Sequence, residues 1–128
     1  VNMTANPAPL ILLVMSDAVQ RDLIQLALTR QGCKVEVTRE PLNVLEIVSS
    51  QHPSLLILDT FLPGSSGLEV LKNLNKANYL KHTKVILISS YGFPEVIQQA
   101  KDAGVSEFMM KPVDIDDLLQ RTKSLLKI

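Results

Sequence analysis

Several residue types and patterns are scarce in this sequence of 128 residues, and each absence excludes a class of protein. Cys33 is the only cysteine, so the chain can form no internal disulfide and no multi-cysteine metal site. Thirteen basic and thirteen acidic side chains cancel, which leaves no overall field to attract nucleic acid or an anionic membrane. The longest apolar run, Leu10–Met15, is too short to cross a bilayer. We therefore expect neither direct nucleic-acid binding nor a membrane span.

The first residues also lack features that organise structure. Residues 1–9 are polar and interrupted by Pro7 and Pro9, and we expect them to form a disordered leader. No basic segment followed by an apolar one opens the sequence, so we see no signal peptide. Together with the unpaired Cys33, this favours a reducing, cytoplasmic location. Residues 10–128 have the length and the 46% hydrophobic content of one folded domain.

The remaining sequence alternates strictly between segments typical of strands and segments typical of helices. Continuous apolar runs at residues 10–15, 55–58 and 85–88 indicate strands that are buried on both faces. Shorter strands are expected at residues 33–38 and 106–110, with a helix after each of the five strands. Such strands need helices on both faces of a parallel sheet. The predicted fold is therefore α/β, a doubly wound, five-stranded parallel sheet of the flavodoxin-like (βα)5 type.

The apolar spacing of two helices predicts which side chains they bury. The first helix is expected to start near Ala18, with Asp17 and Gln20 forming a capping pattern, and to stop at Gly32. Pro41 suits the first turn of the second helix. The expected buried stripes are Val19, Leu23, Leu26 and Ala27 in the first helix, and Leu42, Leu45 and Val48 in the second.

Polar residues with different chemistry follow three of the predicted strands. Asp59 ends the third strand, Ser89 ends the fourth and Lys111 follows the fifth. In open α/β sheets, functional sites gather beyond the carboxyl ends of the strands, at the point where the strand order reverses. An acid, a hydroxyl and an amine on one edge therefore predict a site there.

Three motifs around these residues resemble the receiver domains of two-component response regulators. Residues 59–67, DTFLPGSSG, are similar to the family's phosphoacceptor loop. Residues 85–92, VILISSYG, are similar to its fourth strand with a terminal Thr or Ser, and residues 104–112, GVSEFMMKP, to its fifth strand with an aromatic and a Lys-Pro pair. The resemblance covers residues 10–127, so residues 10–128 are identified as one divergent receiver domain.

The resemblance implies a signalling role that is not enzymatic. It implies that Asp59 accepts a phosphoryl group from a histidine kinase or a phosphotransfer protein. Lys111 is implied to contact the phosphoryl oxygens, and Ser89 to form a hydrogen bond with the phosphoryl group. Phe108 is implied to follow Ser89 inward in the active state. The family also suggests a homodimer through the fourth helix, fifth strand and fifth helix, where the candidate residues are Tyr91, Val96, Met109 and Met110.

The sequence departs from the family at the end of the first strand. Family members carry two adjacent acids there, which hold magnesium together with the phosphoacceptor, whereas this chain has Met15 and Ser16. The oxygens left for a metal are those of Asp59, the backbone carbonyl of Phe61, and Ser16 or Asp17. Because magnesium prefers hard oxygen ligands and usually one or two carboxylates, we predict only weak magnesium binding.

Two functions are compatible with this pattern. The presence of Asp59, Ser89 and Lys111 favours a phosphorylatable receiver in phosphorelay signalling. The replacement of the acids by Met15 and Ser16 favours the alternative, a pseudo-receiver that binds proteins independently of phosphorylation. The two hypotheses differ in the effect of Asp59→Asn, which abolishes function in the first and leaves partner binding intact in the second.

Overall fold

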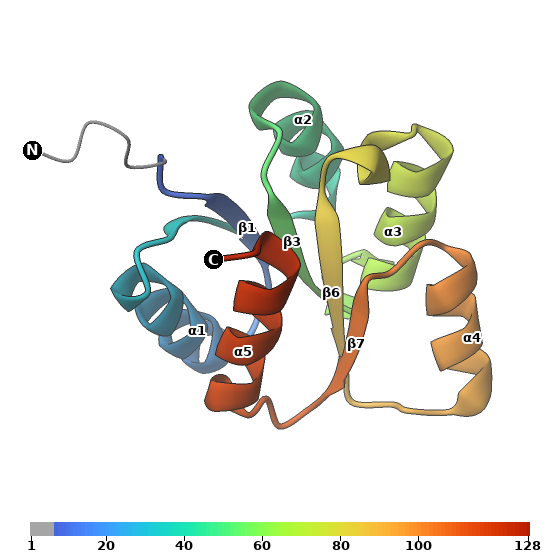
Figure 1. The fold of residues 1–128 in the computed structure, drawn as a ribbon. Coiled ribbons are helices and arrows are strands. Elements are labelled where there is room, and N and C mark those ends of the chain that lie inside the picture. The colour runs from blue at the N-terminus through green and yellow to red at the C-terminus, as the bar shows by residue number, and fades with distance from the viewer. Residues whose placement is uncertain (1–6) are drawn as a thin grey trace, which may run out of the picture.

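Five parallel strands form the centre of the structure, a computed structural model in which residues 7–128 are described (Figure 1). Their order across the sheet is β2-β1-β3-β6-β7, so the order reverses between β1 and β3. This confirms the predicted doubly wound, flavodoxin-like fold. The strands are β1 (Leu10–Val14), β2 (Lys34–Thr38), β3 (Leu55–Asp59), β6 (Lys84–Ser89) and β7 (Glu107–Met110).

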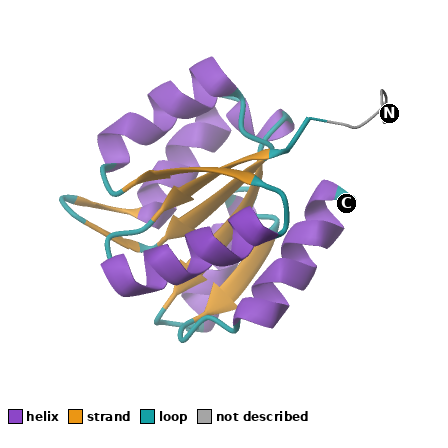
Figure 2. Cartoon of the chain, turned by 90° about the vertical axis from the view of Figure 1, so that its left-hand side faces the viewer, coloured by secondary structure: helices purple, strands orange, loops and turns teal. Residues whose placement is uncertain are grey.

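Helices cover both faces of this sheet, as strands buried on both sides require (Figure 2). One face carries α1 (Ala18–Arg30) and α5 (Ile115–Leu126), and the other carries α2 (Pro41–Gln51), α3 (Gly67–Lys76) and α4 (Pro94–Asp102). Two short elements were not expected from the sequence. They are a hairpin of β4 (Phe61–Leu62) and β5 (Ser65–Ser66), and a single 3-10 turn, η1 (Tyr79–Lys81).

Alternate residues of each strand feed two separate hydrophobic clusters. Ile11 and Leu13 of β1 belong to the cluster under α1 and α5, whereas Leu12 and Val14 belong to the cluster under α2, α3 and α4. All four side chains are fully buried. Burying a side chain of this size contributes about 1.5–3 kcal/mol, so the central strands stabilise the whole domain and hold its carboxyl edge rigid.

Side-chain caps set the starts of the two helices that share a face. Asp17 Oδ1 accepts the backbone N–H of Gln20 at 3.1 Å, and Asp114 Oδ1 accepts that of Asp117 at 3.0 Å. Each cap satisfies an amide that the helix itself leaves unbonded, which is worth about 1 kcal/mol. The predicted cap at Asp17 is therefore confirmed, and its carboxylate is committed to α1.

The predicted buried face of α1 is wrong. Val19, Leu23 and Leu26 are 72%, 55% and 50% exposed, whereas Ile24 and Leu28 are buried in the cluster that α1 shares with α5. Apolar residues occupy more than one side of this helix, so helical spacing alone is compatible with either of two stripes facing the core. Packing against the sheet and α5 selects the stripe of Ile24 and Leu28.

Helical spacing also failed to predict which residues are buried at the start of α2. Leu42, predicted to be inward, is 89% exposed, while Pro41, Val44 and Val48 are buried. These three buried residues recur at spacings of three and four, and Leu42 lies about 100° away from Pro41 around the helix axis. Leu45 is half-buried, as its place beside this stripe requires.

The N-terminal prediction falls mostly outside the described residues. Residues 1–6 of the expected leader are not among them, and residues 7–9 have no helix or strand. The carbonyl of Pro9 accepts the backbone N–H of Lys34 at 2.9 Å, which ties the chain to β2 just before β1 begins. Within residues 7–128, no helix is long and apolar enough to span a membrane.

Adjacent substitutions in α1 test which of its faces carries the stability. We expect Leu23→Ala to change the free energy of unfolding by less than about 0.5 kcal/mol, since the side chain is largely exposed. Ile24→Ala should cost about 3 kcal/mol, because it removes a buried side chain and leaves a cavity. Urea denaturation followed by circular dichroism measures both. Equal losses would contradict the observed orientation of α1.

Candidate functional site

The carboxyl edge of the sheet, at the lower end of Figure 1, gathers the predicted site residues. Asp59 is the last residue of β3, next to the place where the strand order reverses. Ser89 ends β6, and Lys111 follows β7 directly. Neighbouring parallel strands end at the same edge, which explains why residues 52 positions apart in sequence come into contact here.

The Asp59 carboxylate is buried and accepts a hydrogen bond at each oxygen. Its exposure is 1%, Oδ2 accepts a hydrogen bond from Lys111 Nζ at 2.7 Å, and Oδ1 accepts the backbone N–H of Phe61 at 3.0 Å. The Lys111 side chain keeps 18% of its surface exposed. A carboxylate removed from water is costly unless a counter-charge and hydrogen bonds compensate it. The ion pair with Lys111 supplies that compensation.

Ser89 connects the ends of β6 and β7. Its hydroxyl oxygen accepts the backbone N–H of Tyr91 at 3.0 Å, and its carbonyl accepts the backbone N–H of Lys111 at 2.8 Å. The side chain is 1% exposed, and the peptide bond between Lys111 and Pro112 is cis. One serine therefore links the lysine of the site to the loop that leads into α4.

Gly67 contributes to the site in a way that the sequence analysis missed. A Cβ atom at this position would overlap the backbone carbonyl oxygen of Asp59, and the Gly67 N–H donates to the carbonyl of Thr60 at 3.0 Å. Only glycine allows the start of α3 to approach β3 this closely. The sequence shows only that a glycine follows Asp59 by eight residues, and this spacing does not reveal the close contact.

Aromatic side chains near the edge occupy two different environments. Phe108 is half-buried and packs against the cluster under α2, α3 and α4, so its inward movement stays a prediction. Tyr91 and Phe93 are 63% and 59% exposed, and their rings stack with centroids 6.0 Å apart. Gly92 lies between these two residues in the sequence and is in close contact with Met110, which is 46% exposed. A Cβ atom added at Gly92 would lie 2.7 Å from the Met110 sulfur. The stacking partner Phe93 was not foreseen.

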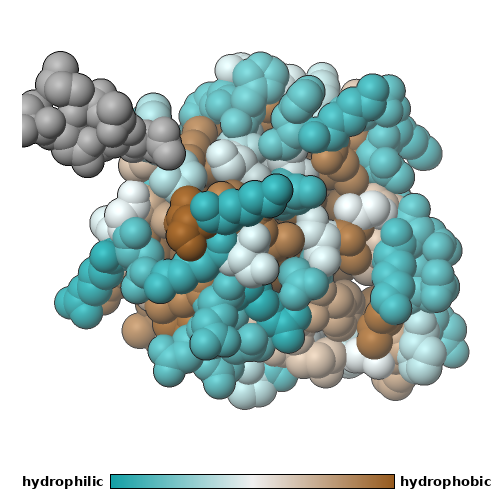
Figure 3. Space-filling view, viewed as in Figure 1, coloured by the Kyte–Doolittle hydropathy of each residue, from teal (hydrophilic) through white to brown (hydrophobic). Residues whose placement is uncertain are grey.

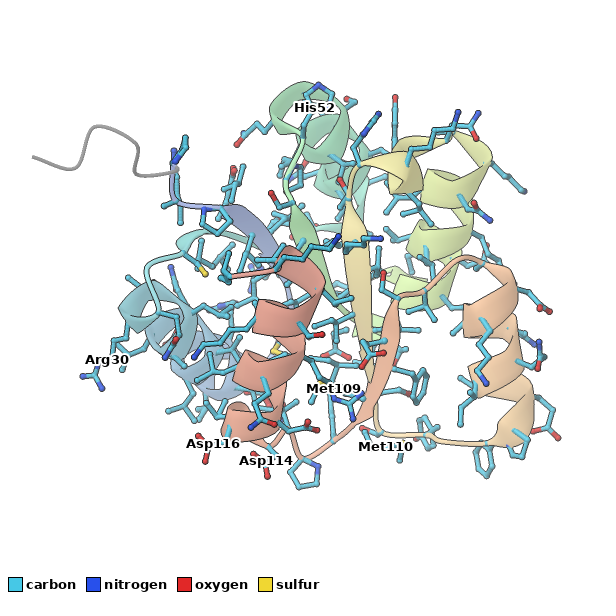
Figure 4. All side chains as sticks on the ribbon, in the orientation of Figure 1. Arg30, His52, Met109, Met110, Asp114 and Asp116 are labelled. Carbon is cyan, nitrogen blue, oxygen red and sulfur yellow. The ribbon has the colours of Figure 1, made fainter. Side chains whose placement is uncertain are left out.

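Other chemically reactive side chains stand apart from this edge. Figure 4 shows His52 at the opposite end of the sheet from Met110 and Asp114. Cys33 is buried, and burial raises the pKa of its thiol, so it is held as the neutral form. Neither residue provides a nucleophile or a base for the site around Asp59.

The residues present do not fit the magnesium ion that the resemblance implied. Both Asp59 oxygens already accept hydrogen bonds, and the exposed Asp17 carboxylate caps α1. Among residues 7–128, no group of three or more His, Cys, Asp or Glu side chains is placed to hold a metal. Ser16 and the Phe61 carbonyl offer only neutral oxygens, so Asp59, already paired with Lys111, is the single carboxylate left for magnesium, which usually binds one or two.

The β2-β1-β3-β6-β7 sheet, with a buried and paired aspartate at its carboxyl edge, is a doubly wound α/β domain whose site lies where the strand order reverses. The sequence profile described as response regulator receiver domain matches residues 11–123. The chain therefore belongs to this family, and it is a receiver domain of two-component signalling.

Individual relatives agree with this assignment over most of their length. Sporulation initiation phosphotransferase F of Bacillus subtilis strain 168 is 30% identical over 108 residues, which cover 84% of this chain and 86% of the relative. Two-component response regulator ORR12 of Oryza sativa subsp. japonica is 30% identical over 112 residues, or 87% and 93% of the two chains. A CheY-like receiver domain protein from Methanospirillum hungatei JF-1 superposes with a TM-score of 0.86 at 28% identity, with 94% of each chain covered.

A double-mutant cycle tests the energetic role of the ion pair. Lys111→Met should lower the free energy of unfolding by about 3 kcal/mol, because it leaves the Asp59 carboxylate buried and unpaired. In the Asp59→Asn background the same change should cost much less, since no buried charge remains. Chemical denaturation of the four proteins gives the coupling energy. A coupling near zero would show that the two side chains do not stabilise each other.

Proposed function

We propose that Asp59 accepts a phosphoryl group from a phosphohistidine of a histidine kinase or a phosphotransfer protein. The observation that carries the proposal is the Asp59 carboxylate, buried at a strand end and 2.7 Å from the Lys111 ammonium. A nucleophile and a fixed cation are what phosphoryl transfer requires of the protein. The domain acts as a phosphoacceptor in a signalling chain, and not as an enzyme with turnover.

The transfer exchanges one bond to phosphorus for another. An oxygen of Asp59 forms a bond to phosphorus while the N–P bond of the donor breaks, and the electron pair of that bond returns to the imidazole nitrogen, which takes up a proton. Lys111 turns from the carboxylate oxygen that it contacts now to the oxygens of the arriving group. The N–H of Phe61, already bonded to Asp59 Oδ1, holds the carboxylate in place.

Ser89 is the proposed reporter of the phosphorylated state. Its hydroxyl oxygen now accepts the N–H of Tyr91, while the hydroxyl proton is free to donate to a phosphoryl oxygen on Asp59. Reorientation of this hydroxyl changes the support of the loop that carries Tyr91 and Phe93. Inward movement of Phe108 is the second part of this proposed switch. Phe108 pairs with Leu87 of β6 and packs against the cluster under α2, α3 and α4, so it lies next to the strand that ends in Ser89.

The face that we propose for a homodimer consists of α4, β7 and α5, and it is turned toward the viewer in Figure 3. Polar residues cover most of it, and apolar groups show between the helices. Phe93, Tyr91 and Met110 each expose about half of their surface or more, and a second copy would bury them. Arg121 on α5 bonds to Asp117 and Glu107, and the hydrogen bond to Asp117 raises its pKa, so this charge is balanced within the chain.

The environment proposed for the domain follows from its donor. A histidine kinase or phosphotransfer protein presents its phosphohistidine in the cytoplasm, and the unpaired Cys33 suits that compartment. A net charge of zero supports the further proposal that the domain itself does not bind nucleic acid.

The proposed phosphorylation is tested with a small phosphodonor and with a phosphorylated histidine protein, each in the presence and absence of magnesium. We expect an acyl phosphate on Asp59, visible by intact mass and by peptide mapping, and removed by hydroxylamine. Asp59→Asn is the matched control, because it keeps the size of the side chain and removes the nucleophile.

Absence of the acyl phosphate with every donor, in a protein that gives a folded NMR spectrum, would overturn the proposal. The pseudo-receiver would then explain the chain better, provided that Asp59→Asn leaves partner binding unchanged. The combination of no label and no effect of Asp59→Asn separates the two functions, because only the phosphoacceptor depends on this carboxylate.

The proposed dimer face predicts a mass that depends on concentration. Light scattering should show the mass approaching two copies as the concentration rises, with Phe93→Ser keeping one copy because it removes an exposed ring from the contact. Leu42→Ser is the control, since Leu42 is 89% exposed on α2, away from this face. One copy at every concentration, with and without phosphorylation, would contradict the proposed face.

A further inference from the structure

The position next to Asp59 on the neighbouring strand belongs to Met15. Strands β1 and β3 are paired in parallel up to Val14 and Leu58, and one further step in this register sets Met15 beside Asp59. The Met15 side chain is fully buried in the cluster that also contains Ile24 and Leu118. A thioether packed among aliphatic side chains is a poor ligand for magnesium.

The charges around Asp59 are already balanced. The carboxylate contributes one negative charge and Lys111 one positive charge, at a separation of 2.7 Å. Addition of a divalent cation to the unphosphorylated site would leave two uncompensated positive charges beside a group that is 1% exposed. Burial of an uncompensated charge is strongly unfavourable, so the pair with Lys111 opposes metal entry as well as holding the carboxylate.

A second cation stands at the end of β1. Arg21 Nη1 donates to the carbonyl oxygen of Met15 at 3.4 Å, and the Arg21 side chain is only 22% exposed. Its nearest acid, Asp22, is 3.9 Å away and 73% exposed, so it offsets little of this charge at short range.

The acid nearest in sequence is held elsewhere. Asp17 is two residues beyond Met15, and its carboxylate accepts the N–H of Gln20 at the start of α1. Release of this cap to reach a metal would cost about 1 kcal/mol before any gain from binding. Ser16, half-buried, contributes a neutral hydroxyl and no charge.

From these contacts we infer that this receiver uses no divalent cation, and that Lys111 alone supplies the positive charge at Asp59. The chemical part of this inference, phosphoryl transfer without a metal, rests on the proposed function of Asp59. The binding part does not, because the affinity of the unphosphorylated chain for magnesium is a property of the residues described above.

The binding part is tested by magnesium titration of the wild-type domain, followed through its amide NMR spectrum. We expect no saturable shifts at Asp59, Thr60 or Phe61 at millimolar magnesium. The double variant Met15→Asp and Ser16→Asp restores two carboxylates, whose charge matches the added ion. It should bind magnesium about tenfold or more tightly per added carboxylate, and its spectrum should shift at Asp59.

Matched variants separate charge from packing. Met15→Leu keeps the size of the buried side chain, Ser16→Asn matches the shape of the Ser16→Asp variant without its charge, and both should remain silent toward magnesium. Because an acid in place of the buried Met15 can unfold the domain, Ser16→Asp alone is the second gain-of-function variant, with an affinity between those of the wild type and the double variant. Saturable, millimolar binding by the wild type that Asp59→Asn abolishes would overturn the inference. So would a folded Ser16→Asp variant that binds no more tightly than the wild type.

The chemical part is tested by the rate at which Asp59 is labelled by the small phosphodonor. The wild-type rate should be the same in magnesium and in a chelator, and Lys111→Met should reduce it in both. A rate that rises tenfold or more with magnesium would overturn this part. No labelling under either condition, by the small phosphodonor or by the phosphorylated histidine protein, together with a silent titration would reject the proposed phosphoacceptor role and leave the absence of metal binding standing.

Discussion

The buried ion pair of Asp59 and Lys111 is the interaction on which the functional edge depends. The pair keeps a charged carboxylate stable at 1% exposure in the folded domain. It also connects β3 to Lys111, the residue after β7, across the intervening strand β6. Its energy comes from low local solvation, which strengthens the attraction and equally raises the penalty for separating the partners. The hydrogen bonds of Ser89 on one side and the close approach of Gly67 on the other keep the same edge rigid.

Much of this arrangement could be predicted from the sequence, because the strongest constraints are local or topological. Apolar runs of strand length predicted the central strands, and the parallel topology then required Asp59, Ser89 and Lys111 to share an edge. The cap at Asp17 could be predicted as well, since it depends on residues only three positions apart.

The errors arose where tertiary packing chooses between options that the sequence leaves equal. The exposure of Leu23 and Leu42 depends on how each helix is rotated against the sheet, which helical spacing does not determine when apolar residues lie on several sides. The role of Gly67 and the stacking of Tyr91 on Phe93 depend on distances between segments. Backbone approach and ring geometry of this kind have no signature in spacing alone.

The stacked ring of Tyr91 also makes the chain its own optical probe. The sequence contains no tryptophan, and of its two tyrosines Tyr79 begins η1 and packs against the core, whereas Tyr91 lies in the loop bonded to Ser89. Tyrosine emission from the native chain therefore comes from one ring at the functional edge and one anchored by the core. We expect a change in the bonding of Ser89 to alter the emission of the first ring, superimposed on the emission of the second in the same band.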